Sequence, residues 1–103
     1  MISARISKRA ERDLTGIENY IAANNPQAAE RVRQALLDTA DLLANNSDIG
    51  SNILNASPRH AQTRWFLVPR FHNYLIFYQP FQDTIVVLRF LHAAQDWTRF
   101  FAE

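Results

Sequence analysis

The first half of the chain has the hydrophobic period of two amphipathic helices. Apolar residues recur every three or four positions between Ser7 and Ala23, and the same period returns between Pro26 and Ala44. Ser7 can cap the first helix, and Asn25 followed by Pro26 is a typical helix start. Because the break between the two segments is so short, the pattern predicts a helical hairpin.

The second half has the pattern of strands. Three runs rich in β-branched and aromatic residues, 64–68, 73–78 and 84–92, predict an antiparallel three-stranded meander. Residues 2–6 alternate between apolar and polar, which predicts a short edge or added strand. The segment 46–62 has neither the hydrophobic period of a helix nor that of a strand. A loop of that length is either functional or a passive crossover from helix to sheet.

Both faces of the predicted sheet are apolar. One face would carry Phe66, Tyr74 and Tyr78, and the other Trp65, Leu75 and Phe77. In the last strand, simple alternation puts Ile85, Val87 and Leu91 on one face, and Val86, Leu88 and Phe90 on the other. The hairpin can cover one face, so the second must be covered by the long loop, by the tail 97–101 or by another protein chain. An apolar face left open would be a binding site.

The composition is that of one ordinary globular domain, residues 1–103, with 48% hydrophobic and 20% charged residues. The chain has no cysteine, which excludes disulfides and thiolate metal sites and suits a reducing compartment. Neither a signal-peptide core nor an apolar run of roughly 20 residues is present. We therefore predict a cytoplasmic α+β protein. His60 and His72 have no partner at metal-ligand spacing, so no metal or cofactor is predicted.

The charge pattern limits the possible partners. A net charge of +1 argues against a dedicated nucleic-acid surface, and no membrane contact or specific nucleic-acid binding is predicted. The segment 57–73 nevertheless holds Arg59, Arg64 and Arg70 and no acid. These arginines are either solvated side chains or a basic rim for an acidic protein or a phosphate backbone. Arg89 lies in an otherwise apolar strand, which predicts an ion pair for it.

Several motifs carry a resemblance to a known family. They are Asp13-Leu14-x-x-Ile17, Tyr20-Ile21, Asn25-Pro26-x-Ala28-Ala29, Ile49-Gly50, Arg64-x-Phe66-x-Val68, the run 73–78 and above all the run from Val87 to Asp96. In this order, across nearly the whole chain, they resemble the ParE branch of the RelE/ParE superfamily of bacterial toxins. The resemblance implies a β-α-α-β-β-β fold and a toxin of a type II toxin–antitoxin module. It also implies DNA gyrase as the target and a ParD-like antitoxin that neutralises the toxin.

The other branch of that superfamily consists of ribonucleases that cut mRNA on the ribosome. Such cleavage needs a general base, a general acid and cations around the phosphate, and Arg64, Arg89 and His92 are the candidates here. Against this, Lys8 is the only lysine and the net charge is near zero. His92 is equally well explained as a structural residue bonded to Asp96. We therefore predict inhibition by binding; the alternatives are the ribonuclease and a fold that has lost toxicity and serves as a binding module.

The resemblance and the apolar sheet together suggest how the antitoxin binds. An amphipathic antitoxin helix would enter the groove left by the hairpin, with its acidic residues on the arginine rim. The predicted antitoxin-binding residues are Arg59, Arg64, Phe66, Arg70, Tyr74, Tyr78 and Arg89. The alternation of side chains along the strands does not show which face of the sheet meets the hairpin.

Overall fold

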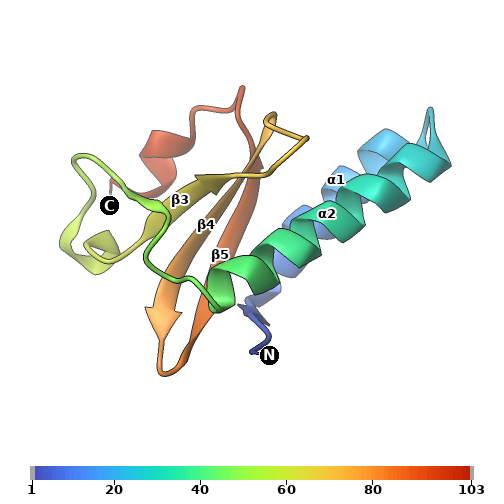
Figure 1. Cartoon of the computed structure of the whole chain (residues 1–103). Helices are drawn as coiled ribbons and strands as arrows, with labels where there is room; N and C mark the ends of the chain where they lie inside the picture. Colours follow the sequence, from blue (N-terminus) through green and yellow to red (C-terminus); the bar gives the residue numbers. More distant parts are fainter. Residues whose placement is uncertain (1, 103) are drawn as a thin grey trace.

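The computed structural model describes residues 2–102, and it places a helical hairpin along one side of a sheet (Figure 1). Helix α1 spans Lys8–Ala22 and helix α2 spans Pro26–Ala44. The Oγ of Ser7 and the Oδ1 of Asn25 each accept a hydrogen bond, at 3.1 Å, from the backbone N–H three residues further on. Both predicted caps and the predicted hairpin are therefore confirmed. Neither of these helices is long and apolar enough to cross a membrane.

The sheet has five strands in the order β1-β5-β4-β3-β2. Their bounds are Arg5–Ile6 (β1), Ser51–Asn52 (β2), Arg64–Leu67 (β3), Tyr74–Phe81 (β4) and Thr84–His92 (β5). The predicted meander β3-β4-β5 is antiparallel, but β1 pairs with β5 in parallel, so the sheet is mixed. Strand β2 lies in the segment expected to be irregular. Two short 3₁₀ helices, η1 (Pro58–His60) and η2 (Trp97–Phe100), complete the α+β fold.

A bulge in β5 breaks the predicted alternation. Phe77 pairs with Arg89 and Tyr78 pairs with Val87, so the register skips Leu88. One extra residue reverses the parity of everything beyond it. The residues of β5 that pack in the helix-side core are therefore Ile85, Val87 and Phe90. The prediction that Phe90 lies on the face opposite Val87 was wrong for this reason.

Both faces of the sheet are covered by the chain itself. The helix side forms the larger core, and on the other side Leu75, Phe77, Leu91 and Phe101 form a second core. The rings of Phe77 and Phe101 stack with their centroids 4.6 Å apart. Ile53 of the long loop and Trp97 of η2 also pack against this second core. The long loop and the C-terminal tail thus cover the second face of the sheet. The open sheet face that was predicted to form a groove for the antitoxin does not exist in this structure.

Polar side chains close the edge of the sheet nearest the helices. The backbone N–H of Ala4, just before β1, donates to Asp41 Oδ1 at 3.0 Å. Further along, β5 extends beyond β1, and there the N–H of Phe90 donates to Asp13 Oδ2 at 3.1 Å. Unpaired backbone groups at a sheet edge invite pairing with another chain. These two carboxylates occupy such groups, so this edge is not available for strand addition at Ala4 or Phe90.

Candidate binding site between the helical hairpin and the sheet

The three candidate catalytic residues are not brought together. Arg64 lies opposite Tyr78 in the sheet register, whereas His92 lies opposite Tyr74. Four positions along β4 correspond to roughly 13 Å. Arg89 lies between them in the register. No single phosphate group can contact all three side chains in this arrangement.

Arg64 and Tyr78 hold the loop that follows α2. Arg64 Nη1 donates to the carbonyls of Gly50 at 2.6 Å and Asp48 at 3.3 Å. The hydroxyl of Tyr78 donates to the carbonyl of Ser47 and accepts from the N–H of Gly50, both at 2.9 Å. Burial raises the pKa of Tyr78, and its side chain is 0% exposed. Tyr78 therefore offers no surface to a partner, and Arg64 is already engaged.

Arg89 has the ion pair that the sequence predicted. Its Nε lies 2.7 Å from Asp13 Oδ2 and its Nη2 lies 3.0 Å from Asp13 Oδ1. The two side chains are only 14% and 13% exposed. The guanidinium carbon also lies 4.8 Å from the centre of the Phe100 ring. Arg89 is thus a partly buried structural cation that joins α1 to the sheet and to η2, rather than a free rim charge.

His92 organises the turn that follows β5. Its ring nitrogen Nδ1 accepts a hydrogen bond from the backbone N–H of Ala94 at 3.0 Å, and the backbone N–H of His92 donates to Gln95 Oε1 at 2.9 Å. Asp96 instead accepts from the hydroxyl of Thr98 at 2.9 Å. The predicted bond between His92 and Asp96 was therefore wrong. Both residues shape the same segment, but through different partners.

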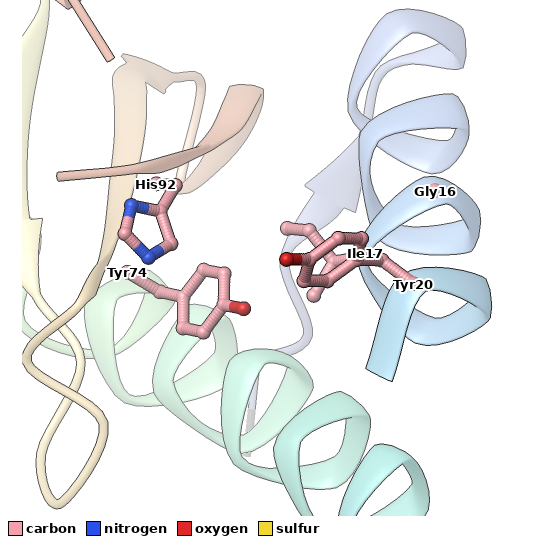
Figure 2. A pocket seen from close by; sticks show the side chains of 5 residues that line it. All are labelled: Gly16, Ile17, Tyr20, Tyr74 and His92. Carbon is pink, nitrogen blue, oxygen red and sulfur yellow. The ribbon is translucent and has the colours of Figure 1, made fainter. Parts of the chain in front are cut away.

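A cleft lies where the hairpin meets the end of the sheet (Figure 2). It is lined by Gly16, Ile17 and Tyr20 of α1, Tyr74 of β4 and His92 of β5. Figure 2 shows the phenol rings of Tyr20 and Tyr74 directed toward one another from opposite walls. The volume of the cleft is about 360 Å³. This is enough space for side chains of a partner.

The chemistry of the cleft suits apolar and aromatic groups. Tyr74 and His92 contact each other edge to face, with their ring centres 5.2 Å apart. Burial, and to a lesser extent the neighbouring Tyr20 phenol, raise the pKa of Tyr74, so this phenol stays neutral at physiological pH. No Asp, Glu, Lys or Arg lines the cleft. Within residues 2–102, no group of three His, Cys, Asp or Glu side chains is placed to hold a metal ion.

The remaining candidates are spread over the surface. Arg70 is exposed in the β3–β4 turn, where its φ of 70° is left-handed. Arg59 is exposed on η1, and its carbonyl accepts a hydrogen bond from Gln79 at the other end of β4 from Tyr74. Phe66 is half-buried and packs against the helix-side core. Of these three, only Arg70 belongs to the turn that leads into Tyr74.

Gly16, Ile17 and Tyr20 are the cleft residues that the sequence analysis did not assign to a site. The helical period of α1 admits either Tyr20 or Ile21 as its last apolar position, and the Tyr20 side chain is 80% exposed. Tyr20 and Ile21 are consecutive in the helix and cannot both face the core. Tyr20 lies four positions after Gly16, on the same helix face. That spacing was the available signal.

Comparisons with known proteins identify the family. The family model described as "ParE toxin of type II toxin-antitoxin system, parDE" matches residues 4–97. This chain belongs to the ParE toxin family. It is 31% identical over 97 residues to "Toxin RelE3" of Caulobacter vibrioides, covering 92% of this chain and 98% of that protein. The resemblance noted in the sequence is thereby confirmed, and the chain is a type II toxin–antitoxin toxin of the ParE family.

A solved structure supports the fold of this ParE toxin. The structure described as "Chromosomal ParDE TA system from P. aeruginosa" matches with a TM-score of 0.70 and 20% sequence identity. The match covers 89% of this chain and 96% of the other. At that identity the likeness establishes the shared fold alone.

Proposed function

We propose that this ParE toxin acts in the cytoplasm by binding and inhibiting DNA gyrase, and that a ParD-like antitoxin neutralises it. The observation that carries the proposal is the dispersal of the candidate catalytic groups. Arg64 is bonded to loop carbonyls, Arg89 to Asp13, and His92 Nδ1 to a backbone N–H. General acid–base cleavage needs such groups free and convergent on one phosphate. Inhibition by binding needs neither.

The cleft supports the antitoxin half of the proposal. Its walls combine aromatic rings with polar tips, the composition typical of the energetic centre of an interface. An amphipathic antitoxin helix would insert apolar side chains between Tyr20 and Tyr74, in place of the sheet groove first predicted. Arg70 remains a rim cation for an acidic residue of that helix. Tyr78, Arg64 and Arg89 leave the predicted contact set, because they are buried or engaged.

A second function has one specific observation in its favour. The relative that is 31% identical is named as a RelE toxin, and the RelE branch is the ribonuclease branch. Tyr74 and His92 also lie side by side in the cleft, so a phenol and an imidazole, two groups able to take part in acid–base chemistry, meet there. Ribosome-dependent mRNA cleavage is therefore the alternative to test.

One experiment separates these functions. Purified toxin is added to a gyrase supercoiling reaction and, in parallel, to translating ribosomes whose mRNA is mapped by primer extension. The proposal expects loss of supercoiling or trapped cleaved DNA, and intact mRNA. Addition of the antitoxin encoded by the adjoining gene should restore supercoiling. Codon-specific mRNA cuts that disappear in His92→Ala would establish the alternative, and no effect in either assay would indicate a binding module without toxicity.

A further inference from the structure

The turn after β5 is closed by the side chain of Gln95. His92 begins this turn, and its carbonyl accepts a hydrogen bond from the backbone N–H of Gln95 at 3.0 Å. In the opposite direction, the backbone N–H of His92 donates to Gln95 Oε1 at 2.9 Å. The backbone N–H of Ala93 also donates to the carbonyl of Asn73, the residue before Tyr74. The turn is therefore closed on itself and attached to the start of β4.

Gln95 occupies a backbone group that the sheet leaves unpaired. The backbone N–H and carbonyl of Tyr74 form hydrogen bonds with residues in the segment 68–71. Tyr74 and His92 are therefore paired without a backbone hydrogen bond between them, and the N–H of His92 is directed to the outer side of β5. Strand β1 does not reach this position, because its pairing with β5 ends at Val87. The amide oxygen of Gln95 replaces a neighbouring strand there.

The same turn determines how the His92 ring meets the cleft. The backbone N–H of Ala94 donates to His92 Nδ1 at 3.0 Å, and a backbone N–H can only donate. This hydrogen bond requires an unprotonated Nδ1, so the ring proton is on Nε2. The ring contacts Tyr74 edge to face, and Figure 2 shows it on the wall of the cleft across from Tyr20. Turn and ring are thus fixed together.

We propose that Gln95 is a positioning residue of the cleft, which holds His92 in the orientation and tautomer that the antitoxin meets. The inference rests on the antitoxin binding proposed above. Gln95 is exposed and is not one of the residues that line the cleft, so it acts through the turn. A wall that is already ordered loses less freedom when a partner binds. Because water can replace an exposed hydrogen bond, the stability of the fold should depend little on Gln95.

The first test compares three side chains of similar length at this position. Gln95→Met removes the acceptor oxygen, whereas Gln95→Glu retains one. Nitrogen-15 chemical shifts of the His92 ring distinguish its two tautomers. We expect the proton on Nε2 alone in the wild type and in Gln95→Glu, and a mixture of tautomers in Gln95→Met. The ring of His60, which contacts Phe101 in the second core, is the internal control and should be unchanged.

The second test measures the consequence for binding. The ParD-like antitoxin encoded by the adjoining gene should dissociate about fivefold faster from Gln95→Met than from the wild type, an effect of the size of one hydrogen bond. It should dissociate from Gln95→Glu at the wild-type rate. Dissociation rates are compared because an added surface charge mostly changes association. Gln27→Met is the control, since Gln27 is an exposed glutamine on α2 that lines a different hollow.

The outcomes separate this inference from the proposed function. A single Nε2 tautomer in Gln95→Met would overturn the inference and leave the proposed function standing, because His92 would then be held without Gln95. A mixture of tautomers with unchanged antitoxin dissociation would overturn it as well. A thermal midpoint clearly lowered in Gln95→Met would assign Gln95 a structural role in its place. An antitoxin that fails to bind the wild type would overturn both proposals.

Discussion

Asp13 and Arg89 are 76 positions apart in the sequence and form an ion pair with two hydrogen bonds, which joins the first helix to the last strand. The same Asp13 carboxylate binds the N–H of Phe90 at the edge of the sheet. One side chain therefore compensates a partly buried cation and closes a strand edge. Because Arg89 also contacts Phe100, this pair connects the helix layer, the sheet and the C-terminal cover.

Removing one member of this pair should strongly destabilise the protein. Asp13→Ala leaves the Arg89 guanidinium without its carboxylate and the Phe90 N–H without an acceptor. We expect a loss of about 3 kcal/mol in the free energy of unfolding, measured by urea titration. The double variant Asp13→Leu with Arg89→Met removes both charges and should lose less than Asp13→Ala. A loss below about 1 kcal/mol in Asp13→Ala would mean that the pair is solvent-screened.

The close approach of Gly50 to Tyr78 leads to a second prediction. A Cβ at Gly50 would lie 2.8 Å from the Tyr78 ring carbon Cε1 and would overlap its hydroxyl. Tyr78 is fully buried and cannot move aside. Gly50→Ala should therefore cost about 2 kcal/mol of stability, as overpacking of a core does. Gly16→Ala is the matched control, because a Cβ there meets nothing within 4 Å. If both substitutions were equally mild, the loop around Gly50 would have to be adaptable.

Much of this fold could be predicted from local sequence. The two helices follow from period and caps, and Ser7 and Asn25 make the expected cap bonds. The meander follows from runs of β-branched and aromatic residues. These features depend on residues a few positions apart, which is the range over which sequence patterns carry information.

The features that were missed depend on distant contacts. The bulge at Leu88 is set by how β5 pairs with β1 and β4, and it reverses the position of Phe90. The second face of the sheet is covered by the loop and the tail rather than by a partner chain, and this cover depends on packing between Phe101 and Phe77. No local sequence pattern encodes that contact. The site shifted for the same reason: Tyr78 is drawn into the core, and Tyr20 is left exposed.

The surroundings of His60 predict a pH dependence. Its Nδ1 lies 3.0 Å from Thr63 Oγ1, which also accepts a hydrogen bond from Gln79 Nε2 at 2.7 Å. Burial, and next the positive charge of Arg59, lower the pKa of His60. The ring also contacts Phe101 edge to face at 5.0 Å, so it supports the C-terminal cover.

The sign of the effect follows from proton binding. The unfolded chain, with a His60 pKa of about 6.5, binds this proton more readily than the folded chain does. The stabilisation is therefore fully present above about pH 6.5 and is lost as the pH falls through the folded-state pKa. Urea midpoints measured across this range should fall toward acid pH in the wild type and fall less in His60→Gln. His72→Gln, in the exposed β3–β4 turn, is the control and should follow the wild type.

Two turns with the same backbone strain offer a matched test of the cleft rim. Arg70 has φ 70° and Gln82 has φ 55°, both left-handed. Glycine relieves that strain, so Arg70→Gly and Gln82→Gly should each leave stability unchanged or raise it by up to about 1 kcal/mol. Only Arg70→Gly removes a cation from the turn that leads into Tyr74, so only it should slow antitoxin association. If the two variants bind alike, Arg70 is not a rim contact.

Gly16 allows the cleft to be filled without touching the core. It lines the cleft, and a Cβ added there has open space around it. Gly16→Ala should raise stability by about 0.5–1 kcal/mol, since glycine is a poor residue within a helix, and should leave antitoxin binding intact. Gly16→Leu should be at least as stable as the wild type, but its side chain would occupy the space in which we propose that the antitoxin binds.

We expect Gly16→Leu to weaken antitoxin binding at least tenfold, about 1.4 kcal/mol, through faster dissociation. Association and dissociation rates are measured by surface plasmon resonance for Gly16→Leu and Gly16→Ala. Because both variants replace the helix glycine, the comparison between them cancels the effect of that replacement on helix stability. Thermal unfolding of both variants shows that neither loses the fold. Antitoxin binding to Gly16→Leu as tight as to Gly16→Ala would show that the antitoxin contacts the toxin elsewhere. Weakened antitoxin binding in Gly16→Leu, with unchanged binding in Gly16→Ala, would place the antitoxin between Tyr20 and Tyr74.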